Sequence, residues 1–210
     1  MRLQATPADF AAALAATGRD DAASLPLLDP PAVAALLAST RGLAYRAARP
    51  LVGGEGREVR QDFELTMAIP EGHPVRGLAD ALTALANAAR ALLPEDPLPA
   101  AVLPGGLRFN DLIAQRYGLG SAGITPHRDH LRYVGLVVLV TLAGEADLVL
   151  LSDREGSDPR RFPMGPGVAT LMRAPGFGGS RERPFHRVTD LREPRVSIGL
   201  RHDTRPGEPT

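Results

Sequence analysis

The sequence predicts a single, mainly β domain of the α+β class, a double-sheet jelly roll with N-terminal helices packed outside it. The first hundred residues carry helical spacing, whereas from residue 107 onward short apolar runs alternate with glycine- and proline-rich turns. A length of 210 residues suits one domain. We therefore expect a helical support region over residues 1–100 and a jelly-roll core over residues 107–203.

Three segments of the support region have helical patterns, at 8–17, 32–39 and 75–93. Gly18 follows the first segment and is typical of a helix stop, and Asp29 precedes the second as an N-cap. In the third segment, leucine recurs at three- and four-residue intervals, which predicts one apolar face. These three helices are expected to pack against the sheets.

The apolar runs predict strands over seven ranges: 60–69, 107–117, 134–142, 146–151, 167–172, 185–188 and 195–201. The run 134–142 is almost entirely apolar and largely β-branched, which is typical of a strand buried on both faces. Glycine-rich residues 118–123, the charged stretch 152–161 and residues 174–180 are predicted to be loops. The tail after Asp203 is predicted to be disordered.

Composition excludes several classes of function. The chain carries 24 basic and 24 acidic residues, so no overall field attracts it to nucleic acid or to a membrane surface. It contains no cysteine, which excludes disulfides, thiolate zinc sites and a cysteine nucleophile. No signal-peptide pattern opens the sequence, and no apolar run approaches 18 residues. We expect a soluble, cytoplasmic protein with no membrane partner.

A metal-binding pattern lies near the middle of the chain, in Pro126-His127-Arg128-Asp129-His130. His127 and Asp129 are two residues apart, so a strand would project both side chains from one face. His186 lies 59 residues further along and is the third candidate ligand. Two histidines and one carboxylate form the ligand set of non-heme Fe(II) oxygenases, and Zn²⁺ accepts the same ligands.

An arginine-bearing strand follows this pattern, over residues 195–201. With a period of two, one face presents Arg195, Ser197, Gly199 and Arg201, and the other face presents only apolar side chains. Buried charges cost several kcal/mol unless they are paired. A guanidinium matches a carboxylate in bidentate fashion, so the strand predicts a ligand that is a dicarboxylic acid.

Taken together, these motifs resemble the Fe(II)/2-oxoglutarate-dependent dioxygenases, and most of all their AlkB-like branch. The order is H-x-D, a distant His, and Arg195-x-Ser197-x-x-x-Arg201, where the branch has R-x-N-x-x-x-R. Gln115-Arg116-Tyr117 stands ten residues before His127, where the branch has N-x-Y. Serine and glutamine thus replace two asparagines. The resemblance covers roughly residues 107–203.

The resemblance implies a cupin-like double-stranded β-helix that uses Fe(II), 2-oxoglutarate and dioxygen. His127, Asp129 and His186 would hold the iron. Arg195 would bind the distal carboxylate of 2-oxoglutarate with Ser197 beside it. The residues implied for the rest of the co-substrate site are Arg201, near the metal-proximal carboxylate, and Tyr117 with its neighbour Gln115.

The remaining histidines and charged loops have weaker predicted roles. His130 is expected to point away from the metal, and His73 and His202 are expected to face solvent. Charged and aromatic residues that could line a substrate mouth are Arg132, Tyr133, Asp153, Arg154, Arg160, Arg161 and Arg173.

The sequence favours a small molecule, an amino acid or a peptide as the substrate. AlkB-like repair enzymes place a carboxylate shortly after H-x-D, but here His130, Leu131 and Arg132 follow. The chain also contains no Trp, and base stacking contributes about 1–3 kcal/mol per base in proteins that bind single strands. Two alternatives stay open: a nucleic-acid demethylase, and a cupin-like metal protein without 2-oxoglutarate chemistry.

Overall fold

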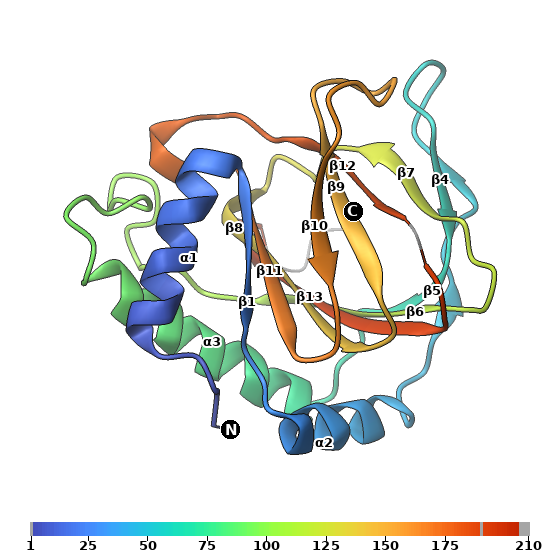
Figure 1. Cartoon of the computed structure of the whole chain (residues 1–210), viewed down its shortest axis with the longest axis horizontal. Helices are drawn as coiled ribbons and strands as arrows, with labels where there is room; N and C mark the ends of the chain where they lie inside the picture. The colour runs from blue at the N-terminus through green and yellow to red at the C-terminus, as the bar shows by residue number, and fades with distance from the viewer. Residues whose placement is uncertain (1, 190, 206–210) are drawn as a thin grey trace.

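The computed structural model describes residues 2–189 and 191–205, which form two antiparallel sheets with three helices on the outside (Figure 1). This is the mainly β jelly roll that the sequence predicts. Residues 206–210 of the tail predicted to be disordered lie outside the described residues.

The larger sheet has seven strands, in the order β1 (Ala22–Pro26), β11 (Val168–Arg173), β8 (Tyr133–Ala143), β13 (Arg195–Asp203), β6 (Asp111–Tyr117), β5 (Glu64–Thr66) and β2 (Arg46–Ala47). The smaller sheet has six, in the order β10 (Arg160–Met164), β9 (Ala146–Leu151), β12 (Phe185–Thr189), β7 (Gly123–His127), β4 (Val59–Asp62) and β3 (Leu51–Val52). Most neighbours in each sheet are distant in sequence. The site between the sheets is therefore assembled from segments far apart in the chain.

The helices are α1 (Pro7–Asp20), α2 (Pro30–Thr40) and α3 (Pro74–Arg90), with a short 3₁₀ turn η1 (Phe177–Gly179) late in the chain. Thr6 and Asp9 form a capping box at the start of α1, and Asp29 caps α2 by accepting a hydrogen bond from the Ala32 amide at 2.8 Å. The three predicted helices are confirmed. Gly18, predicted as a stop, lies inside α1, and the helix ends at Asp21, which adopts a left-handed backbone.

The helices cover one face of the larger sheet, and the smaller sheet faces the other (Figure 1). The side chains of strand β8 pack on both faces of the larger sheet. Leu136, Val138 and Val140 pack in the cluster that contains the helices, and Val137 packs between the sheets. This alternation confirms that the run 134–142 is buried on both faces.

The predicted strand 60–69 is wrong, because two strands of different sheets occupy this segment. β4 belongs to the smaller sheet and β5 to the larger one, and the chain crosses between them at the buried Phe63. A continuous period-two pattern does not reveal such a crossing.

Two predicted loops, 118–123 and 152–161, are confirmed except at their C-terminal ends, where strands begin. Strand β7 begins at Gly123, at the end of the segment expected to be a glycine-rich connection, and β10 begins in the charged stretch 152–161. At Gly123 φ is +75°, and a Cβ would lie 2.2 Å from the Val188 carbonyl oxygen, so only glycine fits. The strand predicted from residue 107 begins at Asp111. Strands β1, β2 and β3 were not predicted.

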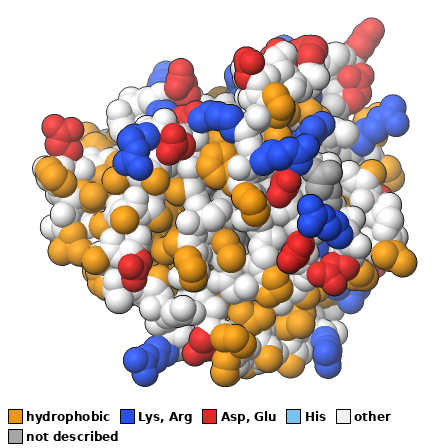
Figure 2. All heavy atoms as spheres, viewed as in Figure 1, with side chains coloured by type: hydrophobic (Ala, Val, Ile, Leu, Met, Phe, Trp, Pro, Cys, Tyr) orange, Lys and Arg blue, Asp and Glu red, His pale blue; other side chains and the backbone are white. Residues whose placement is uncertain are grey.

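Acidic and basic side chains are interspersed over the face seen in Figure 2, as the zero net charge suggests. No helix in the described ranges has the length and apolar character that a membrane span requires.

We expect Leu82→Ala, in the buried face of α3, to lower the free energy of unfolding by about 2–5 kcal/mol, because it leaves a cavity in the core. Leu92→Ala is the matched control, since this leucine is 58% exposed. The control should change stability by less than about 0.5 kcal/mol. Urea denaturation measures both values, and equal losses would contradict the placement of α3 in the core.

Candidate functional site

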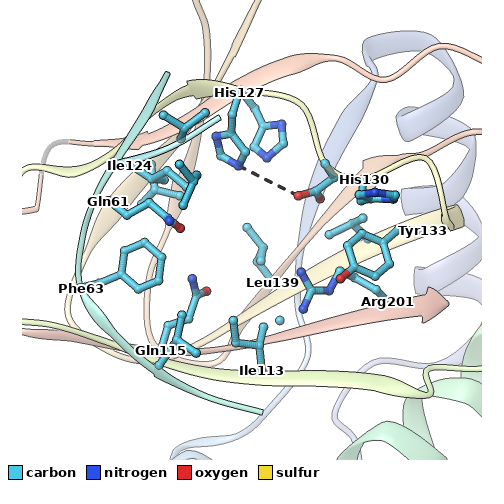
Figure 3. A pocket seen from close by; sticks show the side chains of 18 of the residues that line it. Gln61, Phe63, Ile113, Gln115, Ile124, His127, His130, Tyr133, Leu139 and Arg201 are labelled. Atoms are coloured by element: carbon cyan, nitrogen blue, oxygen red, sulfur yellow. Dashed lines mark ion pairs between the residues drawn. The ribbon is translucent and has the colours of Figure 1, made fainter. Parts of the chain in front are cut away.

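A cavity of about 510 Å³ lies between the two sheets. Figure 3 shows its labelled side chains around an open centre. Apolar walls come from residues such as Phe63, Ile113 and Ile124, and amide groups come from Gln61 and Gln115. Polar and apolar side chains contribute about equally to the lining, and a concave site with convergent polar groups is typical of small-molecule binding.

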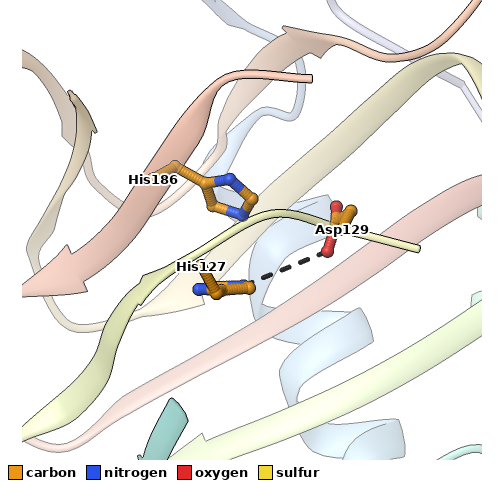
Figure 4. A group of neighbouring side chains, drawn as sticks. All are labelled: His127, Asp129 and His186. Atoms are coloured by element: carbon orange, nitrogen blue, oxygen red, sulfur yellow. Dashed lines mark ion pairs between the residues drawn. The ribbon is translucent and has the colours of Figure 1, made fainter. Parts of the chain in front are cut away.

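His127, Asp129 and His186 meet at one edge of this cavity, with candidate ligand atoms that all lie within 4.8 Å of one another (Figure 4). Nε2 of His127 is 4.0 Å from Oδ1 of Asp129, and the two imidazole centroids are 4.2 Å apart. The structure therefore brings together the three residues that the sequence singled out.

Strand pairing positions the two histidines. His186 in β12 lies directly opposite His127 in β7, and Val188 lies opposite Ile124, so β7 holds one extra residue between these pairs. Such a bulge re-aims neighbouring side chains and accommodates Pro126, which cannot donate a ladder hydrogen bond. β7 ends at His127, so Asp129 follows the strand instead of sharing it, contrary to expectation.

Main-chain carbonyls fix the tautomer of both imidazoles. Nδ1 of His127 lies 3.0 Å from the Thr125 oxygen, and Nδ1 of His186 lies 3.2 Å from the Pro184 oxygen. A carbonyl only accepts a hydrogen bond, so each Nδ1 carries the proton and each Nε2 offers a lone pair. This is the outer-shell arrangement found around metal-ligating histidines.

The electrostatic surroundings favour the protonation states that bind a cation. Burial, followed by the charge of His186, lowers the pKa of His127 to about 4, so its imidazole is neutral near pH 7. Burial raises the pKa of Asp129, but the positive charges of His186, His127 and Arg201 outweigh it and lower the pKa overall. The group therefore offers a neutral His127 imidazole beside an ionised carboxylate.

Arg195 is the largest fully buried side chain, with an exposure of 1%. Its guanidinium donates to Oγ of Ser197 at 2.9 Å and to Oγ1 of Thr141 at 3.1 Å, and it lies 3.6 Å from Sδ of Met164. Nε has no hydrogen-bond partner, and no carboxylate of the described residues forms an ion pair with Arg195. Burial lowers its pKa. An anionic ligand would remove this cost.

Tyr117 and Gln115 lie opposite Arg195 and Ser197 in the β6–β13 ladder. The guanidinium carbon of Arg195 is 5.3 Å from the centroid of the Tyr117 ring. Thr141 was missed by sequence reasoning, because only the β8–β13 register aligns it with Ser197.

Arg201 already has a carboxylate partner. Its Nη2 lies 2.6 Å from Oδ2 of Asp111, and its guanidinium carbon lies 4.3 Å from the centre of the Tyr133 ring (Figure 3). Asp111 was not singled out in the sequence. The signal was present, because pairing Tyr117 with Arg195 in antiparallel strands places Asp111 opposite Arg201.

Among the residues proposed for a mouth, Tyr133 lines the cavity, and Arg160 and Arg173 line a second hollow. The arginines at the rim of the main cavity are Arg46, Arg49 and Arg128. Arg132 forms a buried ion pair with Asp203 at 3.1 Å.

The three outlying histidines have structural contacts. His73 does not simply face solvent: its Nδ1 caps α3 by accepting from the Val75 amide at 3.2 Å. His202 is half-buried and accepts from the Arg108 amide at 3.0 Å. His130 lies at the exposed rim of the cavity, apart from the candidate ligands.

No family model and no curated protein sequence matches the chain. Solved structures do match. One is the non-heme α-ketoglutarate-dependent epimerase SnoN from nogalamycin biosynthesis, with 18% identity, a TM-score of 0.61, and coverage of 92% of this chain and 82% of SnoN. The chain shares the fold of this enzyme. A Pseudomonas putida prolyl-4-hydroxylase matches at 16% identity and a TM-score of 0.58, covering 93% of this chain and all of the hydroxylase.

A third similar structure is OsALKBH1, with 12% identity and a TM-score of 0.59 over 86% of this chain and 97% of that one. The jelly roll predicted from sequence is thus the fold of known α-ketoglutarate-dependent and ALKBH proteins. At these identities the similarity concerns the fold.

We expect His186→Ala to weaken Fe(II) binding by roughly 100-fold or more, since loss of outer-shell partners alone costs about 10–100-fold. Anaerobic calorimetry measures the affinity. His130→Ala is the matched control, because it removes a histidine from the same cavity rim without removing a candidate ligand. Equal losses in the two variants would contradict the assignment of His186.

Proposed function

We propose that the chain is an Fe(II)- and 2-oxoglutarate-dependent dioxygenase that hydroxylates a small molecule, an amino acid or a peptide and releases succinate and CO₂. One observation carries the proposal. A buried arginine without a carboxylate partner lines the same cavity as two histidines and an aspartate whose ligand atoms converge. A metal site alone would not explain this arginine.

His127, Asp129 and His186 would hold the iron. Two imidazoles that present their Nε2 atoms and an ionised carboxylate are a ligand set that suits Fe(II) in oxygenases. When bound, the iron would activate dioxygen, with 2-oxoglutarate supplying two of the electrons. The protein's part is to orient the ligands and to enclose the cavity.

Arg195 would bind the distal carboxylate of 2-oxoglutarate. Its hydrogen bonds to Ser197 and Thr141 hold the guanidinium in one orientation, and its Nε remains free to donate. Gly199 lines the same cavity, and a Cβ there would lie 2.7 Å from Cγ2 of Ile113. Tyr117 and Gln115 complete this side of the proposed co-substrate site.

Arg201 receives a different role from the one that the resemblance implies. Its ion pair with Asp111 occupies the guanidinium, so it is less suited to hold a second carboxylate. Its positive charge favours the ionised form of Asp129. We therefore assign it to the support of the metal-binding carboxylate.

The similar structures support the range of substrates. SnoN has been crystallised with Fe³⁺, α-ketoglutarate and nogalamycin RO, and a Trichoplax adhaerens prolyl hydroxylase with a peptide fragment of a hypoxia-inducible factor. The likeness to OsALKBH1 favours nucleic-acid demethylation as the second candidate.

Anaerobic titration of the Fe(II)-loaded protein with 2-oxoglutarate tests the proposal. The bidentate complex gives a weak visible charge-transfer band. We expect Arg195→Ala to weaken co-substrate binding by about 2–5 kcal/mol, roughly 30-fold or more, since it removes the buried partner of a carboxylate.

Arg116→Ala is the matched control. This arginine lies on the neighbouring strand β6, pairs with Glu64 at the surface and does not line the cavity. Its co-substrate affinity should match the wild type. If Fe(II) binds and no band forms, the chain is a cupin-like metal protein without 2-oxoglutarate chemistry.

The nucleic-acid alternative needs its own measurement. We expect the rate of 2-oxoglutarate turnover to stay flat when methylated oligonucleotides are added, because the chain lacks both an overall positive charge and a tryptophan for stacking. Succinate release is the readout. A rise that depends on the methyl group would replace the small-molecule proposal with demethylation.

A further inference from the structure

A second hollow, of about 410 Å³, is lined in part by Arg128 and Leu131 of the segment that follows His127. Arg128 lines both this hollow and the main cavity. The hollow also reaches the residues just before His186, namely Arg183, Pro184 and Phe185. It is therefore directly beside the candidate metal ligands.

The positive charge of this hollow is only partly neutralised. Two of its five arginines, Arg160 and Arg173, form ion pairs with Asp21. The other three are Arg128, Arg181 and Arg183. None of these three forms an ion pair with a carboxylate in the parts of the chain that the structure describes. They leave a local excess of positive charge in a protein whose net charge is zero.

Two of the three unpaired guanidiniums are held in place by neutral groups. Arg128 stacks on Phe185, with its guanidinium carbon 3.9 Å from the ring centroid. Nη1 of Arg183 donates to the main-chain oxygen of Asp129 at 2.5 Å. Burial and the positive charge of Arg128 lower the pKa of Arg183, and the negative charge of Asp129 offsets part of this effect. Each side chain keeps further N–H donors, so together they suit an anion with several oxygens.

We infer that this hollow binds the anionic group, a phosphate or a carboxylate, of the substrate. The inference rests on the proposed function, because it is the nearby metal site that makes the bound molecule a substrate. It narrows the substrate class to acids and phosphate esters. The anionic group would lie over Arg128 and Arg183, and the remainder of the molecule would extend past Arg128 into the main cavity.

A small anion fits better than a nucleic-acid backbone. Asp158 and Glu182 also line the hollow, and Glu182 is mostly exposed. These carboxylates would repel a continuous row of phosphates, yet they leave room for a single anionic group. A phosphate-tracking surface needs clustered basic residues without such interruptions.

Calorimetric titration of the metal-free protein with inorganic phosphate tests the inference. We expect a Kd on the order of 1 mM, weakened roughly tenfold or more in Arg128→Gln and in Arg183→Gln. Arg41→Gln, at the C-terminal cap of α2, is the matched control and should bind as the wild type does. Circular dichroism melting checks that each variant is folded.

One further variant and two further probes distinguish the possible outcomes. Arg195→Ala should leave phosphate affinity unchanged, and a loss there would mean that phosphate enters the main cavity, which overturns the inference. A titration with acetate in place of phosphate shows whether the hollow prefers a carboxylate or a phosphate group. Binding of an eight-nucleotide DNA strand far more tightly than phosphate, or no phosphate binding at all, would also overturn it.

The titration needs neither iron nor 2-oxoglutarate, so its failure is separate from failure of the proposed function. Phosphate binding without a charge-transfer band would support the anion site and contradict the proposed dioxygenase function. A charge-transfer band without phosphate binding would support the proposed dioxygenase function and contradict the inference that the substrate is an acid or a phosphate ester.

Discussion

The site depends on a charge buried between two sheets. Arg195 is enclosed by β-strands, and its polar contacts are the hydroxyls of Ser197, Thr141 and Tyr117 and the thioether sulfur of Met164. Hydroxyl groups compensate a guanidinium far less than a carboxylate does. A protein of ordinary stability, roughly 5–15 kcal/mol, cannot carry many such groups. The cavity beside Arg195 is where the missing anion has room to bind.

The helices pack on one face of the larger sheet, so the opposite face of that sheet can carry polar side chains. Val196, Ile198 and Leu200 of β13 pack toward the helical side, which leaves the opposite face of the strand for Arg195 and its neighbours. Because successive residues of a strand point to opposite faces, a single segment serves both the core and the site. Stability and function are thus divided between the two faces of the larger sheet.

Local patterns predicted much of this protein. Helical spacing gave α1, α2 and α3, and period-two alternation gave the inward face of β13, because both signals lie within a few neighbouring residues. The crossing of the chain at Phe63 and the two-residue strands β2 and β3 depend on long-range pairing that leaves no local pattern. The partners of Arg195 and Arg201 likewise emerge from strand register.

The bulge before His127 has a consequence for how the sheet assembles. A slip of β12 by one residue against β7 would turn the His186 imidazole to the opposite face and separate it from His127. The three candidate ligands therefore converge in one pairing only. A cation bound there would stabilise this pairing relative to pairings that are shifted by one residue. The metal would then favour correct assembly of the smaller sheet in addition to its role in catalysis.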